Sequence, residues 1–228
     1  WIPFSTPDLE KVLKAYTRTV DHFPVFDEML SKYKQRRLGQ AYNLQDSYEI
    51  ISNKPIMKME DMKGLKIAHA GSFLPMIGAL GATPVQAVYT EIYTSMDTGV
   101  FNGFVMPATS AVAFRIHEVG KHFIRANLGA MIAGIVTINS NVWNKLPKEV
   151  QNILVEVGTE WSWDVYKRCK SLEDSALAQM KKAGVQIYDL SAEEKARWAK
   201  TINESGALAK LVGNCNSKGW PCGDIAKF

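Results

Sequence analysis

Histidine side chains are the first candidates for chemistry, because imidazole titrates near neutral pH and binds metal ions. The chain contains four of them, His22, His69, His117 and His122, and none has the HExxH spacing of zinc proteases. The sequence also lacks a GxSxG elbow, a GxGxxG loop and a P-loop. These residues predict no catalytic centre, no cofactor and no metal site, and they favour a binding protein over an enzyme.

One short segment could bind a ligand without catalysis. Residues 65–69 predict a strand that ends at His69, and Gly71 and Ser72 predict the start of a helix that ends near Leu80. Backbone N–H groups at the start of a helix can hold an anionic or polar group. A plain N-cap role for Ser72 explains the same pattern, so local physics leaves both interpretations open.

The three cysteines are too few for a disulfide scaffold. Cys215 and Cys222 lie in a tail rich in Gly, Pro and Asn, where a turn could join them, and their spacing leaves a disulfide and free thiols open. A zinc site would need at least two further ligands, and no histidine lies nearby. Cys169 falls in a helical pattern and is predicted to be a small buried hydrophobe.

The composition is that of an ordinary globular protein, with 228 residues of which 46% are apolar and 22% charged. No apolar run approaches the roughly 18–20 residues of a membrane span. The net charge is only +4, without a basic stripe interleaved with aromatic residues, so no nucleic acid partner is expected. The length fits one large domain or two lobes.

The elements that must position any site alternate along the middle of the chain. Two helices are predicted in the first forty residues, the second stopping near Gly39, and an extended segment follows over 41–51. Strands at 65–69, 85–88 and 101–105 then alternate with helices at 72–80, 89–98 and 107–118. This alternation predicts βαβ units and a parallel sheet, so the fold class is α/β.

A much longer helix is predicted after Pro147. Apolar residues recur every three or four positions until Gly184, which predicts one helix of more than thirty residues. Because typical helices have about three turns, such a length indicates that this helix bridges two bodies. A strand over 185–190 follows, and then a helix with Ser191 as N-cap and Glu194 in the capping-box position.

A series of short motifs adds a family resemblance. The motifs are MEDMKGLKI at 59–67, LGATPV at 80–85, EIY at 91–93, TGVFNG at 98–103, HEV at 117–119, and Asn139 followed by WNKLP at 143–147. In order and spacing, from about Ile2 to Trp198, the chain resembles the extracytoplasmic solute-binding proteins of TRAP transporters. The resemblance implies a periplasmic binding protein-like fold with two lobes of helix-flanked sheets, which close over a small organic solute, and a long helix spanning both lobes.

The resemblance also implies how the chain is divided. Residues 1–45 are expected to belong to lobe I, 46–130 to form lobe II, 131–170 to return to lobe I with the start of the long helix, and 171–228 to hold its end, a short strand and C-terminal helices. Members of the family are longer at the N-terminus, so the missing N-terminal segment is an expected partner. The membrane components of a TRAP transporter and a periplasmic (extracytoplasmic) location are implied in the same way.

Three positions depart from the family pattern. Most relatives place an arginine after the Lys-Ile strand, where its fork pairs with a ligand carboxylate, and this chain has Ala68 there. A second family arginine aligns with Tyr48, and a family asparagine aligns with Met106. A carboxylate buried without a charged partner would lose several kcal/mol. The expected ligand is therefore neutral, aromatic or partly hydrophobic, and the expected ligand-binding residues are Tyr48, Ala68, His69, Ser72, Phe73, Tyr89 and Met106.

Four alternatives remain open from the sequence. A charged His69 could replace the family arginine, in which case binding would weaken as the pH rises through its titration. Phe73, Tyr89 and Met106 could be ordinary core residues. An α/β enzyme could use His69 with Tyr48 or Glu91 as acid and base. The chain could also be a scaffold relative that has lost its ligand.

Overall fold

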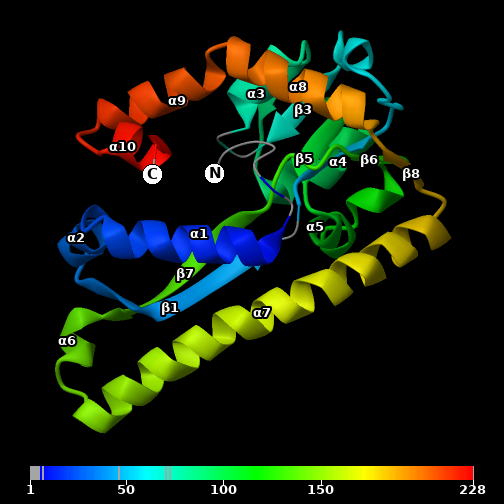
Figure 1. Cartoon of the computed structure of the whole chain (residues 1–228). Helices are drawn as coiled ribbons and strands as arrows, with labels where there is room; N and C mark the ends of the chain where they lie inside the picture. Colours follow the sequence, from blue (N-terminus) through cyan, green and yellow to red (C-terminus); the bar gives the residue numbers. More distant parts are fainter. Residues whose placement is uncertain (1–5, 7, 46, 70, 72, 228) are drawn as a thin grey trace.

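Two unequal parts make up the chain: a six-stranded sheet with helices on both faces, and an arm built on a two-stranded ribbon (Figure 1). The computed structural model describes residues 6, 8–45, 47–69, 71 and 73–227. A single helix, α7 (Lys148–Lys182), runs from the arm to the sheet. Its 35 residues confirm the predicted long helix that joins two bodies.

The large sheet has the strand order β4-β3-β5-β2-β6-β8. Its strands are β2 (Glu49–Ser52), β3 (Lys66–His69), β4 (Thr83–Gln86), β5 (Gly103–Met106), β6 (His122–Arg125) and β8 (Gln186–Asp189). β3 is parallel to β4 and β5, and β6 is parallel to β8, whereas β2 is antiparallel to both of its neighbours. The α/β class is confirmed. The wholly parallel sheet is wrong, because β2 comes directly from the arm without the crossover helix that parallel pairing requires.

Helices cover both faces of this sheet. On one face, α3 (Leu74–Ala79), α8 (Ala192–Glu204) and α9 (Ala207–Asn216) bury a core that includes Trp198, and α10 (Cys222–Lys227) packs on α9. On the other face, the core contains residues of α4 (Ile92–Asp97), α5 (Ala108–Ala113) and the end of α7, including Met180. Three short 3-10 turns complete the body: η1 (Met59–Met62), η2 (Tyr89–Glu91) and η3 (Ile116–Glu118).

The arm carries the remaining elements. They are α1 (Leu9–His22), α2 (Val25–Lys32), β1 (Gln35–Gln45), β7 (Met131–Asn139), α6 (Ser140–Trp143) and the first half of α7. β1 and β7 pair antiparallel from Gln35 opposite Asn139 to Gln45 opposite Met131, with an irregular register between Arg37 and Tyr42. The second predicted helix does not reach Gly39, which lies in β1 with a φ of 53°. A Cβ there would lie 3.1 Å from the Val155 carbonyl oxygen, so glycine lets α7 pack on the strand backbone.

Other local predictions are corrected by competing contacts. The predicted helix over 107–118 is broken at Arg115, which has a φ of 60°, into α5 and η3. Ser191 does cap α8 by accepting the Glu194 N–H at 3.1 Å. The Glu194 carboxylate instead accepts the Met59 N–H at 2.9 Å and the Trp198 Nε1–H at 3.2 Å, so it ties α8 to the sheet body.

The structure shows which cysteines are bonded to each other. Cys215 and Cys222 are joined by a disulfide between α9 and the start of α10. Cys169 is not part of the disulfide and is buried on α7, as predicted, in a cluster with Leu13. In the described part of the chain, no helix combines the length and the apolar character that crossing a membrane would require.

Candidate functional site

An aromatic cluster lies where β3 ends. Tyr48 precedes β2, His69 is the last residue of β3, and Phe73 is the N-cap of α3. The rings of Tyr48 and Phe73 are stacked with centroids 5.0 Å apart, and the His69 ring lies 4.6 Å from Phe73 and 5.9 Å from Tyr48. Backbone hydrogen bonds between Tyr48 and residues 128–129 fix the start of β2. Three of the predicted ligand-binding residues are therefore in direct contact.

Phe104 on β5 connects this cluster to Tyr89. Its ring centroid is 5.8 Å from His69 and 5.5 Å from Tyr89, and Tyr89 lies 5.2 Å from the exposed Phe114. Burial raises the pKa of Tyr89, and the nearby Tyr48 hydroxyl opposes this shift. Phe104 was not among the residues predicted from the sequence. The strand period was a signal for it, since Phe104 and Met106 are two residues apart and share a face.

Ala68 and Met106 lie in the core that also contains Phe104. Both side chains are fully buried, and Tyr89 packs against the same core. Tyr48 and Phe73 belong to the core on the other face. His69 thus lies between the two groups, at the end of its strand. Ser72 lies outside the described residues, so the assignment of all seven residues to a ligand site stays a prediction.

His69 is held as a neutral acceptor. Its Nδ1 accepts the Gly71 N–H at 3.0 Å, which requires an unprotonated Nδ1 and places the ring proton on Nε2. Burial lowers the pKa of His69 to about 4. A charged His69 in place of the family arginine is therefore disfavoured above pH 5. Glu91, the other proposed acid–base partner, is exposed on η2.

The residue that follows Tyr48 in the chain, Glu49, is a buried acid. Glu49 is 2% exposed, and its Oε2 accepts the Asn127 backbone N–H at 2.8 Å. With the Asn127 amide oriented to satisfy its neighbours, the amide donates to Glu49 Oε1 at 3.0 Å and accepts from Lys195 Nζ at 2.8 Å. Burial raises the pKa of Glu49 to about 8, although this hydrogen bond and the nearby Arg125 and Lys195 charges oppose the shift.

Glu49 was not among the predicted site residues either. A signal was present, because a single acidic residue interrupts the apolar start of a short strand, where it can be solvated only by partners from elsewhere in the fold. The Ser47 hydroxyl favours the charged form of Glu49 without making a hydrogen bond of standard geometry. The Glu49 carboxyl therefore belongs to a buried polar group rather than to the aromatic cluster.

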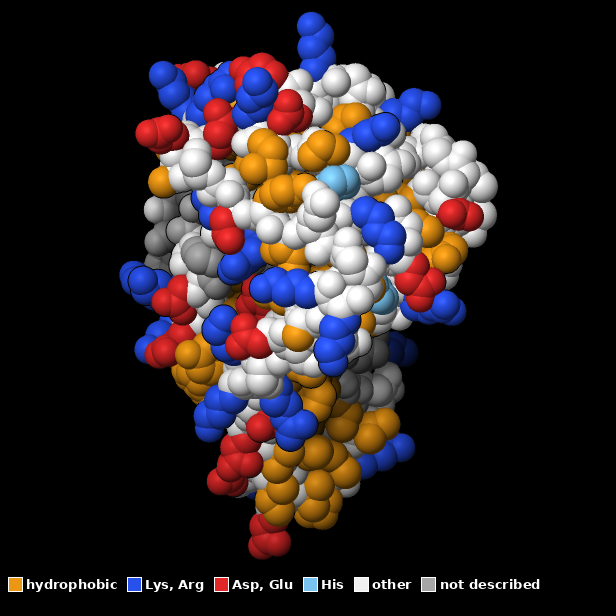
Figure 2. Space-filling view, turned by 90° about the vertical axis from the view of Figure 1, so that its right-hand side faces the viewer, with side chains coloured by type: hydrophobic (Ala, Val, Ile, Leu, Met, Phe, Trp, Pro, Cys, Tyr) orange, Lys and Arg blue, Asp and Glu red, His pale blue; other side chains and the backbone are white. Residues whose placement is uncertain are grey.

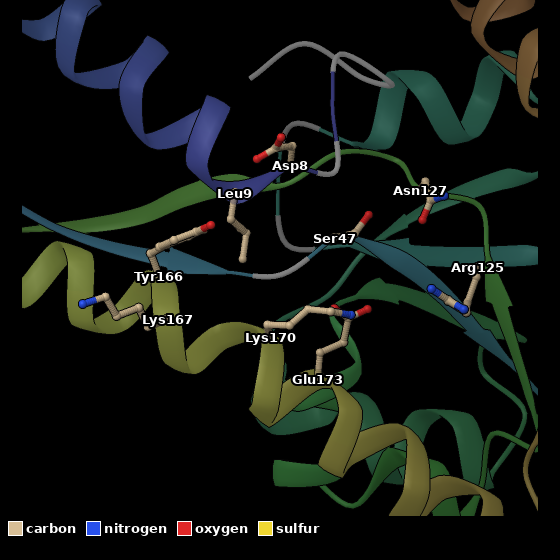
Figure 3. Close-up of a pocket in the computed structure, with 9 residues that line it drawn as sticks. All are labelled: Asp8, Leu9, Ser47, Arg125, Asn127, Tyr166, Lys167, Lys170 and Glu173. Carbon is tan, nitrogen blue, oxygen red and sulfur yellow. The ribbon is translucent and has the colours of Figure 1, made fainter.

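A cavity of about 530 Å³ lies beside this polar group, between α7, the start of α1 and the end of β6 (Figure 3). It is lined by Asp8, Leu9, Ser47, Arg125, Asn127, Tyr166, Lys167, Lys170 and Glu173. None of these residues was predicted as part of a site. In the described part of the chain, no group of three or more His, Cys, Asp or Glu side chains is placed to hold a metal ion.

Curated relatives resemble most of the chain. The C4-dicarboxylate-binding periplasmic protein DctP of Rhodobacter capsulatus is 28% identical over 217 residues, which cover 92% of this chain and 65% of the relative. The sialic acid-binding periplasmic protein SiaP of Vibrio cholerae is 26% identical over 188 residues, which cover 82% of this chain and 57% of the relative. The chain thus spans less than two thirds of the length of these relatives.

Solved structures show the same fold. A TRAP periplasmic solute binding protein from Desulfovibrio salexigens with bound orotic acid superposes with a TM-score of 0.83 at 24% identity, covering 99% of this chain and 71% of that one. Another, from Pseudomonas aeruginosa with bound L-malate, gives 0.78 at 23% identity, covering 90% and 70%. These likenesses confirm the periplasmic binding protein-like fold of two lobes, whose boundaries in this chain stay a prediction.

The family model for bacterial extracellular solute-binding proteins matches residues 2–208, nearly the whole chain. Members of this family are periplasmic or extracytoplasmic receptors for solutes. The match and the relatives agree with the motif series between Ile2 and Trp198. The chain therefore belongs to family 7 of the bacterial extracellular solute-binding proteins, the DctP family.

Proposed function

We propose that the chain is the solute-capturing part of an extracytoplasmic receptor, which delivers a small organic ligand to the membrane components of a TRAP-type secondary transporter. The observation that carries this proposal is the family match over residues 2–208. The ligand is captured between two lobes, and closure of the lobes supplies the affinity. Binding requires no covalent step, so we propose no enzymatic activity.

The proposed ligand is neutral and aromatic or partly hydrophobic, and it contacts Tyr48, Ala68, His69, Ser72, Phe73, Tyr89 and Met106. Support comes from the stacked Tyr48 and Phe73 rings and from a His69 ring that is neutral above pH 5. No arginine stands at the positions of Ala68 and Tyr48 to pair with a carboxylate. The similar structures were solved with acids, among them orotic acid, L-malate and D-glucuronate, so the charge of the ligand is the property to test.

Uracil and orotic acid form a matched pair for this test, since they share one ring and differ by a carboxylate. We expect calorimetry at pH 8 to show tighter binding of uracil than of orotate or L-malate at the aromatic cluster. Because His69 stays neutral, uracil affinity should be unchanged between pH 5.5 and 8. L-malate binding at pH 8 that is tight and that Phe73→Leu weakens would contradict a neutral ligand.

We further propose that a polypeptide segment N-terminal to Trp1 packs on the arm. The outward face of α7 exposes Val150, Ile153, Val157 and Trp161, which are between 37% and 56% exposed and follow one helical stripe. Figure 2 shows hydrophobic side chains gathered at the lower end of the molecule, where the first half of α7 lies. Contiguous apolar surface of this kind usually marks an interaction site.

Serine substitutions distinguish this exposed stripe from the inner face of α7. In the 228-residue chain, the double variant Ile153→Ser and Val157→Ser should leave the urea midpoint nearly unchanged and reduce the binding of a dye that reports apolar surface. Leu154→Ser should destabilise, because Leu154 packs against Leu38 and Trp143. In an N-terminally extended chain, the double variant should lower the free energy of unfolding by about 1–3 kcal/mol. An extended chain that tolerates the double variant would rule out this partner.

A further inference from the structure

Tyr48, a member of the aromatic cluster, lies just before the strand that follows it. β2 begins at Glu49, and its pairing with β6 begins at Ile50. Tyr48 donates its backbone N–H to the Gly129 carbonyl at 3.0 Å, and its own carbonyl accepts the Leu128 N–H at 2.9 Å. The backbone of Tyr48 is therefore held by the loop that follows β6, residues 126–129, and not by the regular pairing of the sheet.

This loop has a backbone conformation that needs support. Asn127 has a φ of 53° and Gly129 a φ of 110°, so both lie in the left-handed region. That region costs energy for a residue with a side chain, although asparagine tolerates it better than most. The Asn127 N–H donates to Glu49 Oε2 at 2.8 Å. A side chain from the neighbouring strand thus stabilises the loop at its strained residue.

The Asn127 side chain extends this contact to α8. In the orientation that satisfies its neighbours, the amide nitrogen donates to Glu49 Oε1 at 3.0 Å, and the amide oxygen accepts from Lys195 Nζ at 2.8 Å. Glu49 is 2% exposed, and each of its two oxygens accepts a hydrogen bond from the same residue. Because a buried carboxyl is stable only where such partners surround it, the conformations of Glu49 and of the loop depend on each other.

We propose that Glu49 is a positioning residue of the solute site. Through its two hydrogen bonds to Asn127, it holds residues 126–129 against the backbone of Tyr48 and so sets the Tyr48 ring in its stack with Phe73, whose centroid lies 5.0 Å away. Glu49 acts through Tyr48 and is not itself a ligand contact. The effect on binding rests on the solute site proposed above, whereas the placement of Tyr48 can be measured without a ligand.

The proposed role concerns the cost of ordering the site. A stack that is already formed does not have to be ordered when a planar ligand binds, so less of the binding free energy is lost. If the loop were loosened, Tyr48 would have to be ordered at the moment of binding. We therefore expect the loss of the Glu49 carboxyl to weaken the binding of an aromatic ring such as uracil.

Glu194 offers a matched control on the same face of the sheet. Its carboxylate also accepts one backbone N–H, from Met59 at 2.9 Å, and one side-chain N–H, from Trp198 at 3.2 Å. These bonds tie α8 to η1 and do not involve residues 126–129. Glu49→Leu and Glu194→Leu each remove a carboxylate with two such bonds and keep a side chain of similar volume.

Amide hydrogen exchange at pH 7 without ligand tests the placement of Tyr48. Relative to the amides of the β2–β6 pairing, the Tyr48 and Leu128 amides should exchange at least about tenfold faster in Glu49→Leu and at the native rate in Glu194→Leu. Glu49→Gln should restore the native rate, since glutamine still accepts the Asn127 N–H. The nuclear Overhauser contact between the Tyr48 and Phe73 rings should weaken in Glu49→Leu alone.

Asn127→Gly serves where Glu49→Leu does not fold. Glycine adopts a φ of 53° without strain and lacks the amide that joins Glu49 to Lys195. It should speed the exchange of the Tyr48 and Leu128 amides by at least about threefold. Calorimetry with uracil then measures the effect on binding: Glu49→Leu should bind at least about fivefold more weakly, and Glu49→Gln and Glu194→Leu should keep the native affinity.

Three outcomes would overturn the proposal. The first is native exchange at Tyr48 and Leu128 in folded Glu49→Leu or, in its place, in Asn127→Gly. The second is equal acceleration in Glu49→Leu and Glu194→Leu, which would show a general loss of stability. The third is native uracil affinity in Glu49→Leu. If the native protein does not bind uracil, the proposed solute is contradicted, and the exchange rates still decide whether Glu49 positions Tyr48.

Discussion

Replacing Glu49 with glutamine is expected to change the pH dependence of stability more than any other single substitution of a charged residue in the sheet body. Burial raises the pKa of Glu49 to about 8 from its ordinary value of 4.5. Between these two values the folded chain holds a proton that the unfolded chain has lost. The free energy of unfolding of the native protein therefore falls as the pH rises, by up to about 1.4 kcal/mol per pH unit.

Glutamine is neutral throughout this window and can still accept the Asn127 backbone N–H. The stability of Glu49→Gln relative to the native protein should thus rise steadily from pH 5 to pH 8, as measured by urea unfolding. His69 has the opposite dependence, since its lowered pKa makes stability rise with pH between about 4 and 6.5. Because His69 is present in both proteins, its contribution cancels in the stability difference between them.

Glu91→Gln is the control for this experiment, because Glu91 is exposed on η2. Its stability difference from the native protein should be flat across the same pH range. If Glu49→Gln is equally destabilising at pH 5 and at pH 8, the proton is not held by Glu49 in the folded state. The Glu49 carboxylate would then be charged in the folded state, stabilised by the buried polar group around Asn127 and Lys195.

The sequence alone was sufficient to predict the elements whose hydrophobic period is continuous along the chain. The apolar period after Pro147 persists for 35 residues, and α7 follows it from Lys148 to Lys182. The alternation of strands and helices between β3 and β5 gave the α/β class, since each βαβ unit is short and contiguous. The direction of β2 could not be obtained in this way, because it depends on a ribbon whose second strand, β7, lies about eighty residues further along the chain.

The candidate site shows the same limit. Tyr48, His69 and Phe73 were predicted to share a ligand and do pack together, because the family motif series and the strand end both point to that edge. Arg125 and Glu49 were not predicted. Each is an ordinary charged residue in a short strand, and the burial of Glu49 depends on distant partners such as Asn127, which donates its backbone N–H to the carboxylate.

Phe73→Ala is expected to lower both stability and ligand binding. Phe73 is 2% exposed and contacts the Tyr48 and His69 rings, so its removal should cost about 3–5 kcal/mol. Trp198→Ala should cost a similar amount, because Trp198 is fully buried in the same core and donates to Glu194. The two variants should therefore lose similar amounts of stability, whereas only Phe73 belongs to the aromatic cluster.

Binding separates the two variants. If uracil stacks at the aromatic cluster, Phe73→Ala should lose at least about tenfold in affinity, and Trp198→Ala should keep the native affinity once the folded fraction is taken into account. Phe73→Leu and Trp198→Phe serve where the alanine variants unfold, since they keep most of the buried volume. Equal affinities for Phe73→Leu and Trp198→Phe would make Phe73 a core residue only. The stacked rings would then stabilise the end of β3, and the ligand would have to contact the lobe elsewhere.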